Sequence, residues 1–298
     1  MARPIALSLL VSLRPRQLTK NLVIFAGLIF GQRLGEPVAV AQAVAAFAIF
    51  CGLSGVVYLV NDVTDREADR QHPVKARRPI AAGDLTPGAA LAAAAGLGLV
   101  AVGSAFWLSR AFGVVAVGYL VLMGCYSGPL KRIVIVDVLT IAVGFLLRAA
   151  AGAVVVAVPI SHWLLVLTLT LALFLALSKR RHELVALKDQ ATGHRVALGE
   201  YSPVLLDQMI GIVAGATLIA YAIYTISPET VEKFHTEQLG LTLPFPIYGI
   251  FRYLYLLHQK AGGGSPADVL LTDKPLLACV ALWGLAVIAI IYGAPLAL

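Results

Sequence analysis

The stretch AVAAFAIFCGLSGVVYLVNDVTDREAD, residues 43–69, joins an apolar run to a cluster of charged side chains. Residues 43–60 carry no charge and are long enough for a transmembrane helix, which takes roughly 17–25 residues. Asp62, Asp65 and Asp69 follow at positions i, i+3 and i+7, and Asn61 lies four residues before Asp65, so a helix would place all of them on one face. Because like charges repel, we expect something positive among them, either arginine side chains or Mg²⁺ carrying a phosphate ligand.

The composition predicts an all-α, polytopic membrane protein. Hydrophobic residues make up 59% of the 298 residues, charged residues only 13%, and the mean hydropathy is +0.87. Nine apolar stretches are candidate membrane spans, which predicts a bundle of nine transmembrane helices with its termini on opposite sides of the membrane. The stretches are 21–34 (short), 39–60, 88–108, 111–127, 133–156, 160–178, 203–226, 241–258 and 275–296.

The positions of lysine and arginine predict the orientation. With the N-terminus in the cytoplasm, 19 of the 23 basic residues fall on the cytoplasmic side, as the positive-inside rule requires. The exceptions are Arg33, Arg110 and Lys233 in outer loops and Arg148 within a span. We therefore expect a multi-pass protein of the inner (plasma) membrane whose active site faces the cytoplasm. Since the basic residues lie in short loops, nucleic acid is not an expected partner.

No hydrophilic stretch is long enough for a separate soluble domain, so we expect one transmembrane domain over residues 1–298. The two longest cytoplasmic loops of this topology are 61–87 and 179–202. Leu7 to Leu13 is interpreted as an interfacial helix. The three cysteines lie singly in apolar stretches and are expected to be small buried hydrophobes.

Two interpretations of the acidic cluster compete. A solvated helix end would pair its acids with Arg66, Arg70 or Arg77, although such surface pairs add little stability. Alternatively, Asn61, Asp62, Asp65 and Asp69 bind Mg²⁺, which favours one or two carboxylates together with phosphate oxygens and water. Basic residues follow closely, and a mixture of acids and cations suits a polyanionic ligand such as a diphosphate. These basic residues are Lys75, Arg77 and Arg78.

The motif Asn61-Asp62-x-x-Asp65-x-x-x-Asp69, followed by the run from His72 to Gly83, resembles the first Asp-rich motif of the UbiA superfamily of intramembrane prenyltransferases. The resemblance covers essentially the whole chain, including the nine expected spans and the place of the motif after the second. It implies that the three aspartates bind Mg²⁺ and the diphosphate of a substrate and are catalytic.

One region departs from that pattern. Where many members carry a second acidic motif after the sixth span, this chain has Ser178-Lys179-Arg180-Arg181-His182-Glu183-Leu184. Lys179 and Arg180 can bind phosphate oxygens directly, and we expect Lys179 to be catalytic. Glu183 lies four residues after Lys179, so it either orients the lysine or only stabilises the helix.

This basic replacement, with the segments Arg14-Pro15-Arg16-Gln17-x-x-Lys20-Asn21 and Leu147-Arg148-Ala149-x-Ala151-Gly152, resembles the phosphoribosyl-transferring branch of the superfamily. That resemblance implies 5-phosphoribose 1-diphosphate (PRPP) as donor and a decaprenyl-type polyprenyl phosphate as acceptor, for synthesis of cell-wall arabinan precursors. The diphosphate would lie at the Mg²⁺ and aspartate site. The 5-phosphate would then need a cationic pocket, for which the candidates are Lys179, Arg180, Arg14, Arg16 and Lys20.

Three further substrate-binding candidates rest on position alone. Arg148 lies inside a span, where a cation is costly and points to a cavity or a buried partner. Tyr126 and Tyr201 lie near inner helix ends, where an aromatic belt would explain them equally well. Asp137 is too far from Arg148 along one helix to pair with it, and Asp273 is expected to cap the last helix.

Two other functions remain open from the residues alone. One is a UbiA-type prenyltransferase acting on an aromatic or glyceryl acceptor, and the other is an anion transporter or channel. Whether the chain forms a homo-oligomer is also open.

Overall fold

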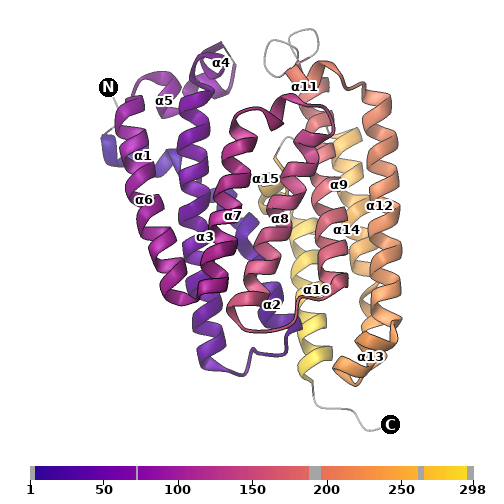
Figure 1. Cartoon of the computed structure of the whole chain (residues 1–298). Coiled ribbons are helices and arrows are strands. Elements are labelled where there is room, and N and C mark those ends of the chain that lie inside the picture. The colour runs from indigo at the N-terminus through magenta and orange to yellow at the C-terminus, as the bar shows by residue number, and fades with distance from the viewer. Residues whose placement is uncertain (1–3, 72, 188–195, 261–264, 294–298) are drawn as a thin grey trace.

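The computed structural model describes residues 4–71, 73–187, 196–260 and 265–293, and within these ranges every regular element is a helix. The long helices stand side by side, with α1, α4 and α5 at one end of the bundle and α13 at the other (Figure 1). The elements are α1 (Ile5–Ser12), η1 (Pro15–Ile24), α2 (Phe25–Phe30), α3 (Pro37–Thr64), α4 (Arg66–Gln71), η2 (Lys75–Arg77), α5 (Pro79–Ala82), α6 (Pro87–Leu108), α7 (Arg110–Ser127), η3 (Leu130–Arg132), α8 (Val136–Val155), α9 (His162–Leu187), α11 (Val196–Gly199), α12 (Pro203–Ile226), α13 (Pro228–Phe234), η5 (Gln238–Thr242), α14 (Pro244–Gln259), α15 (Pro266–Thr272) and α16 (Lys274–Tyr292).

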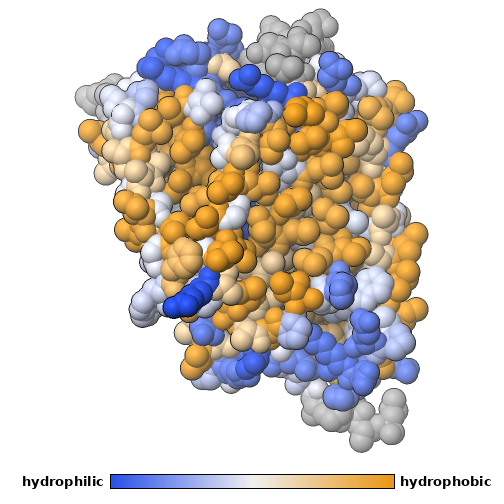
Figure 2. Space-filling model, viewed as in Figure 1, coloured by the Kyte–Doolittle hydropathy of each residue, from blue (hydrophilic) through white to orange (hydrophobic). Residues whose placement is uncertain are grey.

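Seven of the described helices are long and apolar enough to cross a membrane, namely α3, α6, α7, α8, α9, α12 and α16. The remaining two predicted spans differ from the expectation. Residues 21–34 are divided between the end of η1 and α2, which has only 6 residues, and residues 241–258 correspond to α14, which has 16. An apolar band separates two hydrophilic ends on the face shown in Figure 2, in agreement with an integral, multi-pass membrane protein.

Polar side chains set where several of the long helices begin. Ser109, Ser202 and Asp273 each accept a hydrogen bond from the backbone N–H three residues further on, at the starts of α7, α12 and α16. These caps satisfy N–H groups that have no partner within the helix. The predicted cap at Asp273 is confirmed.

Small residues let the N-terminal segment approach α8 closely. A Cβ atom on Gly152 would lie 2.0 Å from the carbonyl oxygen of Ile24, and one on Gly27 would lie 2.5 Å from the carbonyl carbon of Gly152. Glycine at these positions therefore permits η1 and α2 to pack directly against α8. This contact brings Asn21, on η1, to Arg148.

The two largest of the four apolar core clusters in the described residues lie beside the site. One joins α2, α3, α6, α7 and α8 around Phe50, Phe112 and Tyr119, and the other joins α9, α12, α14 and α16 around Phe174 and Tyr253. A cavity of about 2070 Å³ is lined by Tyr119 from the first cluster and by Phe174 and Tyr253 from the second. The site described next lies in this cavity.

Candidate active site

The cavity gathers the predicted site residues from distant parts of the chain. Every one of them lines it except Tyr201. Those that line it are Arg14, Arg16, Lys20, Asn61, Asp62, Asp65, Asp69, Lys75, Arg77, Tyr126, Arg148, Lys179, Arg180 and Glu183.

The acidic motif spans a break between two helices. Asp62 lies in the last turn of α3, Asp65 ends that helix, and Asp69 lies in α4. The backbone bonds from Asp65 N–H to Asn61 C=O (2.9 Å) and from Asp69 N–H to Asp65 C=O (2.8 Å) keep the turn nearly continuous. The side-chain amide of Asn61 also donates to Asp65 at 3.0 Å, so the predicted proximity of these two residues is confirmed.

Cations surround the acids, but they are not the predicted ones. Arg14 and Arg78 both pair with Asp62, and Arg78 also donates to Asp69 Oδ2 at 2.6 Å. The carboxylates of Asp62 and Asp69 are 1% and 5% exposed, so these are buried pairs and not a solvated helix end.

The expected pairing with Arg66, Arg70 or Arg77 is wrong in its choice of partner. Arg70 instead bonds to Glu67 and to the carbonyl oxygen of Ala81. A further cation comes from η3, where Lys131 pairs with Asp65 at 2.5 Å. We expected Arg78 beside a polyanionic ligand, but the sequence did not predict that Arg78 or Lys131 pairs with the acids, because these pairs depend on how the elements pack.

The acids are suited to a hard cation. Asp62 and Asp69 converge on one atom, Arg78 Nη1, at 3.1 and 2.6 Å, so their oxygens face a common point. Within the described ranges no three His, Cys, Asp or Glu side chains form a metal-binding group. Two carboxylates suffice for Mg²⁺ when phosphate and water complete its shell, so the donor set fits this ion.

The basic segment belongs to a helix. The predicted loop 179–202 is wrong in its start, because α9 continues to Leu187 and places Lys179, Arg180 and Glu183 in its C-terminal turns. Arg180 donates to Glu183 at 2.6 Å, while Lys179 Nζ lies 3.8 Å from the same carboxylate. Glu183 thus lies closer to Arg180 than to Lys179, the partner that we expected. Residues 188–195 of the predicted loop lie outside the described residues.

A buried carboxylate faces Arg180 from its other side. Asp137, completely buried, lies with Oδ2 3.8 Å from Arg180 Nε. Its other oxygen accepts a hydrogen bond from the hydroxyl of Tyr201 at 2.8 Å, and that hydroxyl accepts the N–H of Ile135 at 2.7 Å.

Tyr201, which we expected among the substrate-binding residues, does not line the cavity. Its hydroxyl instead donates to Asp137 and accepts from the backbone N–H of Ile135, directly before α8. Burial raises the pKa of the Tyr201 hydroxyl above its ordinary value, so it remains a donor.

Arg148 lies in the cavity wall and has no carboxylate partner in the described chain. Its guanidinium donates to Asn21 Oδ1 (2.8 Å), Gly144 C=O (3.0 Å) and the Tyr119 hydroxyl (2.7 Å). All three acceptors are neutral, so the positive charge remains uncompensated by them. As expected from their spacing, Asp137 is not among its partners.

Burial shifts the acidity of several basic residues of the cavity outside the spans, among them Arg14 and Lys75. Burial lowers the pKa of Arg14, whose guanidinium also lies 4.9 Å from the centre of the Tyr58 ring. Burial likewise holds the pKa of Lys75 below its ordinary value.

Arg14 has a φ of 52°, a left-handed conformation that is uncommon in residues other than glycine. Such strain is characteristic of functional positions.

Comparison with known proteins agrees with this geometry. The model of the UbiA prenyltransferase family matches residues 22–267. The chain belongs to the UbiA prenyltransferase family. The family predicted from the acidic motif is thus confirmed.

Relatives of this UbiA-family chain include two decaprenyl-phosphate phosphoribosyltransferases. The one from Corynebacterium glutamicum is 32% identical over 96% of this chain and 87% of its own length. The one from Mycobacterium tuberculosis strain H37Rv is 31% identical over 91% of this chain and 90% of its own length. A UbiA homologue from Archaeoglobus fulgidus, solved with DMAPP and Mg²⁺, superposes with a TM-score of 0.75 at 18% identity, covering 96% of this chain and 99% of the homologue. It supports the all-helical UbiA fold.

Proposed function

We propose that this UbiA-family protein transfers the 5-phosphoribosyl group of PRPP to a polyprenyl phosphate and releases diphosphate. The observation that carries the proposal is that an acidic group and a basic group of side chains line one cavity. Asp62, Asp65 and Asp69 form its acidic part, whereas Lys179 and Arg180 are basic where many family members are expected to carry a second acidic motif. Relatives named decaprenyl-phosphate phosphoribosyltransferase support the same reaction.

The reaction is a displacement at C1 of the ribose. A phosphate oxygen of the acceptor forms a bond to C1, the bond from C1 to the diphosphate oxygen breaks, and its electron pair leaves with diphosphate. A phosphate monoester is already anionic near neutral pH, so no strong general base is needed. The task of the chain is to hold two anions in line and to neutralise the leaving group.

The residues divide into two roles. Lys75, Arg77 and Arg180 bind phosphate oxygens of the donor, with Asp137 and Glu183 orienting Arg180. Mg²⁺, held by Asp62 and Asp69 with Asp65 and Asn61 beside them, would neutralise the diphosphate as it departs.

We place the reaction at the cytoplasmic side of the inner membrane. The excess of lysine and arginine at that side supports the orientation. The product would serve the synthesis of cell-wall arabinan precursors, as the resemblance to the phosphoribosyl-transferring branch implies.

Purified protein supplied with Mg²⁺, labelled PRPP and polyprenyl phosphate tests the proposal. We expect label to enter the lipid, and Asp65→Ala to lower turnover by at least about 100-fold, the scale for one electrostatic group in a catalytic site. The matched control is Glu67→Ala, because Glu67 is exposed and does not line the cavity. Undiminished turnover in Asp65→Ala would contradict the catalytic role assigned to the acidic motif.

A further inference from the structure

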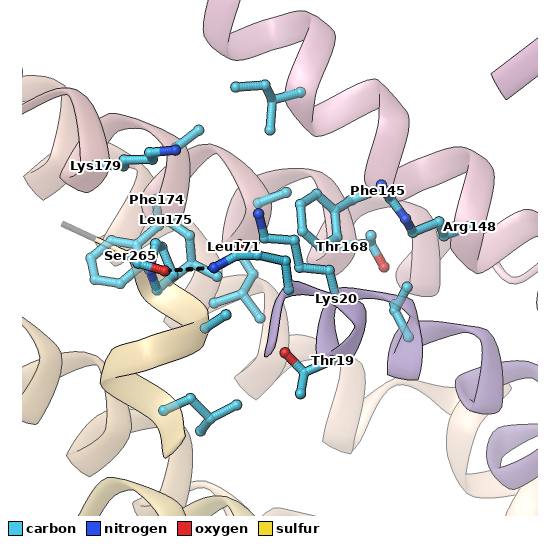
Figure 3. A pocket seen from close by; sticks show the side chains of 18 of the residues that line it. Thr19, Lys20, Phe145, Arg148, Thr168, Leu171, Phe174, Leu175, Lys179 and Ser265 are labelled. Carbon is cyan, nitrogen blue, oxygen red and sulfur yellow. Dashed lines mark hydrogen bonds between the residues drawn. The ribbon is translucent and has the colours of Figure 1, made fainter. Parts of the chain in front are cut away.

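Three basic side chains of the cavity form no ion pair with the aspartates of the acidic motif in the described residues. Lys20 of η1, Arg148 of α8 and Lys179 of α9 all line the cavity. Figure 3 shows Lys20 near the middle of the pocket, with Lys179 on one side and Arg148 on the other. We call these three residues the inner cation cluster.

The charge of the inner cation cluster is not balanced by the protein. Among the described residues, neither Lys20 nor Arg148 forms an ion pair, and the hydrogen-bond acceptors of Arg148 are neutral. Lys179 lies 3.8 Å from Glu183, but that carboxylate also serves Arg180 at 2.6 Å. Cations kept inside a membrane protein without counter-ions are costly, which points to an anionic ligand.

Burial and neighbouring like charges both act on Lys20. Burial, together with the like charges of Lys179, Arg148 and Arg14, pushes the pKa of Lys20 well below its ordinary value, and the attraction of Asp268 does not offset them. A bound phosphate would reverse the balance, because it adds negative charge where the cations meet.

The surroundings of the cluster indicate which phosphate it binds. Phe145, Leu171, Phe174 and Leu175 line the same pocket. In Figure 3, Phe145 and Leu171 lie near Lys20, and Phe174 and Leu175 lie toward Lys179. A ribose 5-phosphate carries hydroxyl groups that these side chains cannot hydrogen-bond, whereas a polyprenyl phosphate joins its phosphate directly to an apolar chain. The apolar neighbours therefore favour the lipid.

We propose that Lys20, Arg148 and Lys179 bind the phosphate monoester of the lipid acceptor, separately from the donor's diphosphate at the acidic motif. This inference rests on the proposed function and assigns one of its two anions to particular residues. The ribose of the donor would then lie between the two groups, so that the acceptor phosphate reaches C1 from the side opposite the leaving group.

Direct binding tests the inference without requiring turnover. Trp163 and Trp283 line the cavity, so tryptophan fluorescence can follow binding of polyprenyl phosphate and of the uncharged polyprenol in detergent micelles. In the wild type we expect the phosphate to improve binding by at least tenfold. In Lys20→Met this ratio should fall by about tenfold, the scale of one charge-assisted hydrogen bond.

Two further variants serve as controls. Lys274→Met removes an exposed lysine outside the cavity and should leave the ratio unchanged. Lys20→Arg keeps the charge and should stay within about threefold of the wild type. An equal loss in Lys20→Arg and Lys20→Met would show that charge is not what Lys20 supplies, and would overturn the proposal.

Binding of PRPP with Mg²⁺, measured on the same proteins by calorimetry, separates the two phosphate sources. We expect Lys20→Met to change the PRPP affinity by less than about twofold, which also shows that the variant is folded. If Lys20→Met instead weakens PRPP and leaves polyprenyl phosphate unaffected, the cluster binds the donor's 5-phosphate and the inference is wrong. If the lipid results hold but PRPP is neither bound nor used, the phosphate site stands and the proposed reaction fails.

Discussion

Arg78 offers a sharp test of the acidic motif, because one guanidinium nitrogen lies between two buried carboxylates. Arg78 Nη1 is 3.1 Å from Asp62 Oδ1 and 2.6 Å from Asp69 Oδ2. Breaking a buried ion pair by removing one partner costs about 3–5 kcal/mol. Since Arg78 is 25% exposed and Asp62 keeps Arg14, we expect Arg78→Met to lower the free energy of unfolding by about 2–3 kcal/mol, less than the full range.

Mg²⁺ should restore much of that loss. If the two carboxylates can hold Mg²⁺ in place of the guanidinium, a concentration 100 times the dissociation constant adds about 2.7 kcal/mol to the folded state. The assay is thermal unfolding in detergent, with EDTA or with increasing MgCl₂. We expect the melting temperature of Arg78→Met to drop by several degrees in EDTA and to rise more steeply with Mg²⁺ than that of the wild type.

The control is Arg33→Met, which breaks an exposed pair with Glu36. Such surface pairs contribute at most about 1 kcal/mol, so this variant should melt close to the wild type and show no added response to Mg²⁺. The reasoning is refuted if Arg78→Met is as stable as Arg33→Met in EDTA, or if Mg²⁺ stabilises the two variants equally.

Three further perturbations follow from the geometry. Gly152→Ala should destabilise the protein by at least about 2 kcal/mol and reduce turnover, because the added Cβ would lie 2.0 Å from the Ile24 oxygen. The control Gly118→Ala adds a Cβ with no atom within 4 Å and should melt near the wild type, so equal melting temperatures of the two variants would contradict the packing argument. Tyr201→Phe should lower the free energy of unfolding by about 1–3 kcal/mol, because Asp137 and the Ile135 N–H lose their hydrogen-bond partner. It should also weaken binding of PRPP more than binding of the lipid. Unchanged stability and PRPP affinity would count against a positioning role of Tyr201. Burial lowers the pKa of Lys75, so the Lys75 side chain is charged below that lowered pKa and loses its charge as the pH rises through it. PRPP affinity should therefore decline at an alkaline pH where an ordinary lysine is still charged. Lys75→Arg should flatten this decline, and an identical decline in the variant would exclude Lys75 as the titrating group.

The parts of the fold predicted from sequence are those that depend on local chemistry. Residues 39–60 are uncharged and mostly apolar, which suffices to predict the helix that α3 forms from Pro37 to Thr64. Residues 22–31 within the shorter predicted span 21–34 are also apolar. Yet a 3₁₀ segment that begins at Pro15, directly after the left-handed Arg14, extends to Ile24 and occupies the first of them. Hydropathy does not show that the 3₁₀ segment η1 and the short helix α2 replace one continuous helix here.

In the site, too, local spacing is predictable from the sequence, whereas contacts made by tertiary packing are not. The proximity of Asn61 and Asp65 follows from a spacing of four residues on a helix, and the structure confirms it. Arg78 lies 16 residues from Asp62 and 9 from Asp69, and Lys131 lies 66 residues from Asp65, so these contacts depend on tertiary packing and not on the spacing within one helix. The polar run after Ser178 is compatible with a loop or a helix, and continuation of α9 to Leu187 decides that Lys179 and Arg180 share its end.

The most direct test of the proposed reaction offers the purified protein a choice of donors. PRPP, a prenyl diphosphate and polyprenyl phosphate are supplied together with Mg²⁺, and the lipid products are weighed by mass spectrometry. We predict one new lipid, heavier than polyprenyl phosphate by a single phosphoribosyl group, which appears only when PRPP is present. Consumption of the prenyl diphosphate with PRPP left intact would contradict the proposal and would make the protein a prenyltransferase acting on another acceptor.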